Sequence, residues 1–303
     1  MITSSGKTAG KVCWEEMLPW EFKEQQRQCP IVYLPMGLCE PHGQISAFGL
    51  DTLKAKYICT AAAERTGGIV APAMGYHVHE SGYHAQWLEE VVGEENPHMT
   101  AIPPHILYSF FLYQLRAFIN AGFRGIIVVT GHAGGNEHDL RLVADSMSQM
   151  SSVPIHVVSD PELVQEHYTG DHAGAYEISQ LLYIRPDLVD FEYAPLAEQP
   201  GSGGMMAMGA DAMQASAELG QKIMESCVQA LSCAAARMLK EIKSASESTV
   251  PAHLTYDQTE KVWRQLQAEN VPWIAAKPYP GQPPIAPQSR WKPYEFLKES
   301  RRF

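Results

Sequence analysis

Short apolar runs alternate with longer helical segments along this chain, and this alternation limits the folds that it can adopt. The apolar runs are rich in valine and isoleucine and bounded by proline or glycine, which is typical of buried strands. They cover residues 31–35, 69–72, 124–130 and 154–158. Helices are predicted over 51–66, 104–121, 136–150, 173–184 and 211–247. A β-α-β-α order joins parallel strands by right-handed crossovers, so we predict an α/β fold with a mostly parallel sheet covered on both faces.

Two segments depart from this alternation. Residues 76–105 form a long irregular stretch with five histidines, two tyrosines and a tryptophan, and the chain beyond residue 250 is rich in proline. We predict one domain over 1–250 and a C-terminal proline-rich extension over 251–303. The extension is interpreted as a surface strap or as an arm that clasps another subunit.

The charge and cysteine content exclude several classes of protein. A net charge of −11 argues against a surface that binds nucleic acid or anionic membranes, since both rely on lysine and arginine. We find no apolar run of membrane-span length and no secretory signal. The six cysteines contain no C-x-x-C pair, which favours reduced thiols and a cytoplasmic location. We therefore expect a small-molecule substrate, with no nucleic-acid or membrane partner.

Acidic and imidazole side chains follow the first predicted strand. Glu40 and His42 are two residues apart in an extended segment, so they project to the same side. Pro41 between them stiffens the chain, and Asp51 follows at the start of the next helix. Carboxylate and imidazole groups together are typical ligands of Zn²⁺, Mn²⁺ and Fe²⁺. The alternative is that Asp51 only caps its helix and Glu40 is a solvated loop charge.

A further imidazole, His132, lies in the loop T-G-H-A-G-G-N that follows the strand at 124–130. The glycines of this loop, Gly134 and Gly135, leave backbone N–H groups free to face a site. A phosphate-binding loop is the competing interpretation, but the lysine of a P-loop and the G-x-G-x-x-G spacing are both missing. Together with Glu40, His42 and Asp51, His132 favours a metal site at the carboxyl ends of the strands.

Two more constellations carry candidate functional residues. His172 and Glu177 in H-A-G-A-Y-E stand at the start of a predicted helix, as metal ligand and base or as acid and ligand. The alternative there is a buried histidine that caps the helix, with Glu177 paired to a neighbour. Within 76–105 we interpret four side chains as substrate contacts of a lid, with an oligomer contact as the alternative. They are His77, His79, His84 and Trp87.

Four motifs of this chain resemble, in the same order, those of the creatininase (creatinine amidohydrolase) family. They are G-L-C-E-P-H-G, Asp51, T-G-H-A-G-G-N and H-A-G-A-Y-E-I-S. The resemblance implies a three-layer αβα sandwich, often assembled into homohexamers, with one or two divalent metal ions in a hydrolytic site. We therefore expect a homo-oligomer that uses Zn²⁺, Mn²⁺ or Fe²⁺.

The resemblance also implies roles for individual residues. One ion would be held by Glu40, Asp51 and His132, and a second by His42 and Asp51, with Asp51 as the bridge. In creatininase itself a glutamate two positions after the loop histidine completes the second site, and this chain has Gly134 there. Glu177 is expected to replace it. His172 would handle the proton.

The predicted function is hydrolysis of a C–N bond, in a cyclic amide or a formamide, within a small polar molecule. Metal-activated water would attack, and the backbone N–H groups at Gly134 and Gly135 would hold the developing oxyanion. One alternative is a hydrolase that opens the ring of a keto-inositol or a lactone. Another is a catalytically inactive metal-binding assembly protein, against which the presence of His172 and Glu177 argues.

Overall fold

A computed structural model of the chain shows a single parallel sheet. It describes residues 11–78, 99–133, 136–198, 208–244, 253–268 and 273. The strands are β1 (Ile31–Met36), β2 (Ile69–Val70), β3 (Gly125–Thr130) and β4 (Ile155–Ser159). Their order is β2-β1-β3-β4, and every neighbouring pair is parallel. The predicted strands and their parallel arrangement are confirmed.

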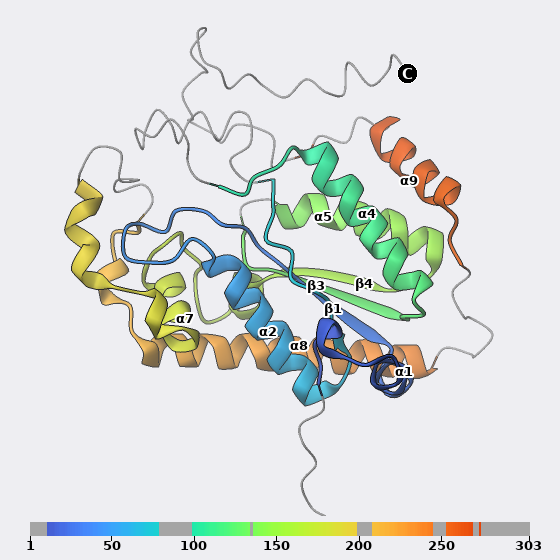
Figure 1. Cartoon of the computed structure of the whole chain (residues 1–303), viewed down its shortest axis with the longest axis horizontal. Helices are drawn as coiled ribbons and strands as arrows, with labels where there is room; N and C mark the ends of the chain where they lie inside the picture. The colour runs from blue at the N-terminus through green and yellow to red at the C-terminus, as the bar shows by residue number, and fades with distance from the viewer. Residues whose placement is uncertain are drawn as a thin grey trace, which may run out of the picture.

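Helices cover both faces of this sheet (Figure 1). One face carries α4 (Pro104–Asn120), α5 (Asn136–Ser151) and α9 (Tyr256–Ala268). The opposite face carries α2 (Leu50–Thr66) and α8 (Ala217–Ser244), with α7 (Ala175–Ile184) packed against both. The three-layer αβα sandwich is therefore confirmed.

The sheet separates two hydrophobic clusters, and β1 contributes to both. Val32, Leu34 and Met36 pack with α4 and α5, whereas Ile31 and Tyr33 pack with α2 and α8. This division follows from the strand itself, because successive side chains point to opposite faces. All residues of β1 and β3 are buried. Strands buried on both faces have continuous apolar sequences, which is why these runs are recognisable in the sequence.

Several elements were not predicted from the sequence. They are the helices α1 (Pro19–Gln28), α6 (Asp160–Val164) and α9, and the short 3₁₀ turns Trp14–Glu16, Pro186–Leu188, Phe191–Glu198 and Ala212–Gln214. Part of the predicted C-terminal extension packs on the core, since Val262, Trp263 and Leu266 of α9 are buried in the cluster of α4 and α5. The division into a domain and an extension stays a prediction. Among the described residues, no helix has the length and apolar character needed to cross a membrane.

The loops at the carboxyl ends of β1, β3 and β4 converge at one edge of the sheet, beside the beginning of α2. At Gly131, directly after β3, an added Cβ would collide with the backbone carbonyl oxygen of Asp51. Only glycine lets the β3 loop pass this close to the first turn of α2. Ligands bind at this edge of open parallel sheets, and the predicted ligand residues are brought together here.

Candidate metal centre

The predicted metal ligands from four separate elements form one buried cluster. Glu40 and His42 come from the loop after β1, Asp51 from the first turn of α2, His132 from the loop after β3, and Glu177 from the first turn of α7. They form two groups of three, Glu40–Asp51–His132 and His42–Asp51–Glu177. Within each group the candidate ligand atoms lie within 4.8 Å of one another. The structure brings the members of the two expected sets together, with Asp51 common to both, and metal binding by them stays a prediction.

Asp51 faces both groups through its two carboxylate oxygens. Oδ2 lies 3.3 Å from Nδ1 of His132, and Oδ1 lies 3.5 Å from Nε2 of His42. Both oxygens are fully buried without a hydrogen bond of good geometry in the described part of the chain. Asp51 does not cap its helix, because Gly49 is the N-cap residue and α2 has no side-chain cap hydrogen bond. A buried carboxylate of this kind needs a cation, and a bridging position between two divalent ions would satisfy both oxygens.

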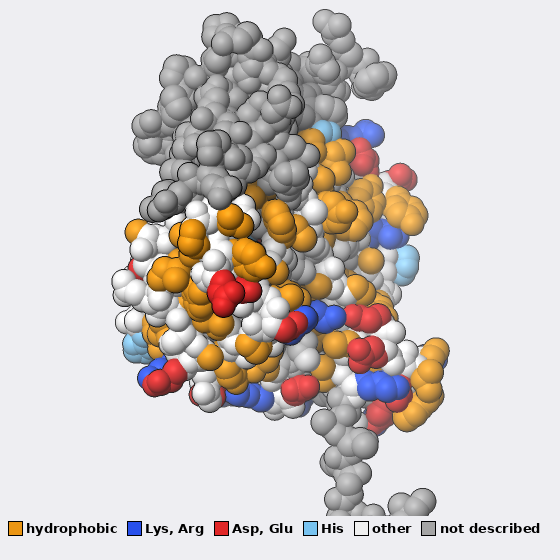
Figure 2. Space-filling view, turned by 60° about the vertical axis from the view of Figure 1, so that its left-hand side comes forward, with side chains coloured by type: hydrophobic (Ala, Val, Ile, Leu, Met, Phe, Trp, Pro, Cys, Tyr) orange, Lys and Arg blue, Asp and Glu red, His pale blue; other side chains and the backbone are white. Residues whose placement is uncertain are grey.

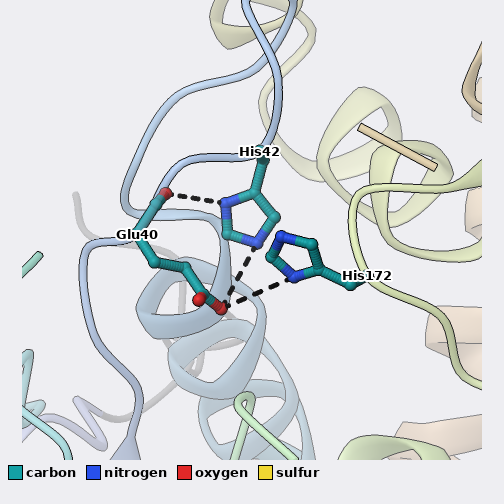
Figure 3. A group of neighbouring side chains, drawn as sticks. All are labelled: Glu40, His42 and His172. Carbon is teal, nitrogen blue, oxygen red and sulfur yellow. Dashed lines mark hydrogen bonds and ion pairs between the residues drawn. The ribbon is translucent and has the colours of Figure 1, made fainter. Parts of the chain in front are cut away.

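The orientation of His42 leaves one nitrogen for a metal ion. Its Nδ1 lies 3.0 Å from the backbone carbonyl oxygen of Glu40, a contact drawn in Figure 3. If Nδ1–H donates to that oxygen, Nε2 carries the lone pair. Nε2 lies 3.5 Å from Oδ1 of Asp51 and 3.5 Å from Oε2 of Glu177. A histidine whose second nitrogen bonds a backbone carbonyl is a common arrangement among metal ligands.

Glu40 connects this buried cluster to His172 at the surface. Its Oε1 lies 2.8 Å from Nδ1 of His132. The same oxygen lies 3.8 Å from Nδ1 of His172, as Figure 3 shows. Glu40 is 1% exposed, so it is not a solvated loop charge. The side chain of His172 is 41% exposed, and its ring lies 5.1 Å from that of His42. His172 therefore stands between the candidate ligands and solvent.

Charge pairing dominates the electrostatics of the cluster. Burial lowers the pKa of His132, but the carboxylates of Glu40 and Asp51 outweigh it and raise that pKa to about 10. Burial likewise raises the pKa of Asp51, but His42 and His132 hold it well below its ordinary value. Imidazoles bind metals only in their neutral form, so a divalent cation entering this site has to displace protons.

Two charged residues of the site were missed in the sequence. Lys54 of α2 is 1% exposed, and its Nζ lies 2.6 Å from Oε1 of Glu177 and 3.3 Å from Oδ1 of Asp160. Asp160 directly follows β4, and this position after a buried apolar run was a usable signal. Lys54 stands one turn after Asp51 in an alanine-rich helix, so it shares the buried face with Asp51.

A cavity of about 370 Å³ opens beside the cluster. Its charged and imidazole walls are Glu40, His132, Asp160, Asp171, His172 and Glu177. Among the described residues, neither lysine nor arginine lines it. The volume is in the range of small-molecule sites, and the excess of carboxylates disfavours an anionic ligand.

The predicted substrate contacts are only partly described. His77 is fully buried, its ring lies 5.6 Å from that of His132, and its Nδ1 accepts the backbone N–H of Val78 at 2.9 Å. His77 packs beside the candidate ligand His132 and does not line the cavity described above. The other substrate contacts, at His79, His84, Trp87, Gly134 and Gly135, lie outside the described residues. Substrate binding by all six stays a prediction.

Comparisons with known proteins show what this chain is similar to. The family model described as creatininase, creatinine amidohydrolase, matches residues 15–235. The chain is 26% identical to a creatinine amidohydrolase of Pseudomonas putida over 252 residues, which cover 73% of this chain and 93% of the relative. It is 24% identical to a 3-dehydro-scyllo-inosose hydrolase of Thermotoga maritima over 203 residues, covering 63% of this chain and 61% of the relative.

Solved structures share the fold. A creatininase crystal structure superimposes with a TM-score of 0.59 at 22% identity, covering 75% of this chain and 98% of its own. A manganese form of creatininase gives a TM-score of 0.60 at 22% identity, covering 76% of this chain and 99% of its own. A Zn–Zn form of a creatininase mutant gives 0.61 at 23% identity, covering 76% and 98%.

Proposed function

We propose a substrate class for this chain, which belongs to the creatininase family of metal-dependent hydrolases. The chain hydrolyses a C–N bond within a small polar molecule, and the bond belongs to a cyclic amide or a formamide. The observation that carries this proposal is the pair of buried ligand groups that share Asp51, beside a cavity of about 370 Å³. A bridging carboxylate with imidazole partners is suited to hold hydrolytic metal ions.

Two divalent ions per subunit, Zn²⁺, Mn²⁺ or Fe²⁺, fit these residues. Glu40, Asp51 and His132 would hold one, and His42, Asp51 and Glu177 the other. Manganese and Zn–Zn forms exist among the structurally similar creatininases. When bound, such ions polarise the scissile carbonyl and make a water molecule more acidic.

The protein's own groups position the reactants and move the proton. The half-exposed side chain of His172 stands at the cavity, with Nδ1 3.8 Å from Oε1 of Glu40, where it can give a proton to the leaving nitrogen. Backbone N–H groups at Gly134 and Gly135 would stabilise the oxyanion that forms at the attacked carbonyl. With these N–H groups as donors, stabilisation of the oxyanion would not require a lysine or arginine side chain in the wall of the cavity.

The cavity wall favours a neutral substrate with hydrogen-bond donors. The carboxylate of Asp171 borders the cavity, and carboxylate oxygens can accept hydrogen bonds from amide, amino or hydroxyl groups. Hydroxyl groups fit equally well, and one relative is a 3-dehydro-scyllo-inosose hydrolase. Ring opening of a keto-inositol or a lactone is therefore the second candidate.

Metal analysis followed by a substrate screen tests the proposal. The purified full chain is assayed for metal content, then treated with a chelator and reloaded separately with Zn²⁺, Mn²⁺ and Fe²⁺. We expect turnover of a cyclic amide or formamide that disappears on chelation and returns on reloading. Turnover of keto-inositols or lactones instead would establish the second candidate. Hydrolysis that persists in full after complete metal removal would refute the metal-dependent mechanism.

We also propose that the protein is a homo-oligomer. Figure 2 shows hydrophobic side chains gathered on the face that carries the turn Phe191–Glu198, and large exposed residues there include Tyr193 and Leu196. An exposed apolar patch of this kind on a protein domain is typical of an interface. Sedimentation of the full chain should give a species larger than one subunit, and a monomer would contradict the proposal.

A further inference from the structure

Lys54 is a fully buried cation that no step of the proposed hydrolysis uses. It projects from α2 one turn after Asp51 and is 1% exposed. Burial by itself lowers the pKa of this lysine, but the charges of Asp160, Glu177 and Asp51 outweigh burial and raise it. Burying such a charge is costly unless carboxylates surround it, and here three do.

The carboxylate of Asp160 forms an ion pair with the ammonium of Lys54. Its Oδ2 accepts hydrogen bonds from the hydroxyl of Tyr176 at 3.1 Å and from Nε2 of Gln180 at 3.0 Å. Its Oδ1 faces Nζ of Lys54 at 3.3 Å. Because both carboxylate oxygens are engaged, Asp160 has a defined orientation. The position of Lys54 is thereby fixed against the metal ligands.

On its other side Lys54 faces Glu177 and the oxygen of Asp51 that points to His42. Its Nζ donates to Oε1 of Glu177 at 2.6 Å and lies 3.7 Å from Oδ1 of Asp51, the oxygen that faces His42. The other oxygen of Glu177, Oε2, accepts the backbone N–H of Ala173 at 2.9 Å and lies 3.5 Å from Nε2 of His42, so it is the oxygen that faces the ligand group. The ion pairs described for Glu40 and His132 involve imidazoles and carboxylates, without Lys54.

We propose that Lys54 is a positioning residue that makes the two metal subsites unequal. It restricts Glu177 to one ligand oxygen, and its charge weakens divalent binding by the group His42–Asp51–Glu177 relative to the group Glu40–Asp51–His132. The physical reason is competition, since the ammonium and the ion both draw on the negative charge of Asp51 and Glu177. This inference rests on the proposed metal binding.

Replacing Lys54 by methionine, which has a similar shape and no charge, tests the proposal. The full chain is stripped of metal and titrated with Mn²⁺ by calorimetry. In the wild type we expect two unequal affinities. In Lys54→Met the weaker affinity should rise by about tenfold or more, because a positive charge within a few ångströms of the ion is gone. The stronger affinity should change less. Lys56→Met, on the same helix but partly exposed, removes an equal charge away from the site and should leave both affinities unchanged.

Two further variants test the proposal even if Lys54→Met folds poorly. Lys54→Met leaves Asp160 and Glu177 without their cation, so its metal-free form should melt at a lower temperature and gain more from added Mn²⁺ than the wild type. The double variant Lys54→Met/Asp160→Asn keeps the net buried charge and should still tighten the weaker subsite. Lys54→Arg keeps the positive charge and should retain the weak subsite.

The outcomes separate this inference from the proposed function. Equal affinities of the two subsites in the wild type would overturn the role of Lys54. So would a weaker subsite whose Mn²⁺ affinity falls in both Lys54→Met and Lys54→Met/Asp160→Asn. Either result would leave metal-dependent hydrolysis in place. Absence of Mn²⁺, Zn²⁺ and Fe²⁺ binding by the wild type would overturn the proposed function itself. A wild type that binds one ion and a Lys54→Met variant that binds two would be the extreme form of the inequality and would support it.

Discussion

The middle of the sheet and its carboxyl edge are equally buried, but they are built from opposite chemistry. All residues of β1 and β3 are buried, and most are apolar. In the loop after β1, Glu40 and His42 are 1% and 0% exposed, and Asp51 in the first turn of α2 is 0% exposed. The core gains stability from its burial, whereas the edge pairs charges that burial penalises. Substitutions in the two regions should therefore have different consequences.

The largest effect is expected from His132→Ala at the edge. This variant removes a candidate ligand nitrogen that faces both Glu40 and Asp51. Bound metal should fall by at least one ion per subunit and turnover to background, while the fold persists. Metal analysis and circular dichroism measure the two properties, with the exposed His167→Ala as control. A full metal complement with full turnover would show that His132 is not a ligand.

His172→Ala should separate catalysis from metal binding within the edge. The side chain is 41% exposed and lies outside the two groups that share Asp51. Metal content should be unchanged, and kcat should fall roughly 10²–10⁴-fold, as expected for a lost general acid–base group. If the variant instead loses an ion, then the third possible group, Glu40–His42–His172, is a real ligand set and His172 belongs to it.

A core substitution should show the reverse pattern. Phe111→Ala removes a fully buried ring from the cluster between α4 and the sheet and should cost about 3–5 kcal/mol of unfolding free energy. Metal content and kcat per folded molecule should stay at the wild-type level. The neighbouring Phe110 is 54% exposed, so Phe110→Ala should change stability by less than about 1 kcal/mol. Loss of metal from folded Phe111→Ala would show that core and edge are coupled.

The most gradual effect, spread over several pH units, is a pH dependence that originates at His77, on the border between the two regions. Burial, followed by the charge of His132, lowers the pKa of His77 to about 3. The unfolded chain binds a proton near pH 6.5, so stability should fall as the pH drops from about 6.5 to about 3. The slope from this one group is at most about 1.4 kcal/mol per pH unit.

Urea unfolding of the metal-free chain measures this slope. His77→Gln should flatten the decline of stability with falling pH, whereas His138→Gln, at an exposed position of α5, serves as the control. The same slope in His77→Gln and in the wild type would mean that the buried imidazole does not contribute to acid sensitivity.

The contrast between α9 and β3 shows where sequence interpretation failed. β3 was recognised because its apolar run is continuous and the helices on both sides are clear. In α9, Thr259, Val262, Trp263 and Leu266 carry the helical spacing of a buried face, yet the helix was overlooked within a proline-rich tail. Its packing on α4 and α5 depends on a surface made by residues more than a hundred positions earlier.

The sequence by itself determined the strands, the parallel character of the sheet and the candidate ligand residues Glu40, His42, Asp51 and His132. These follow from local periodicity and from the chemistry of residue types placed after strands. Only the tertiary structure decided that Lys54 pairs with Glu177, 123 residues away, and that Asp160 supports it. The reason is physical: a buried charge is tolerated only where its partners lie, and the partners of Lys54 come from α7 and the end of β4, which only folding brings together.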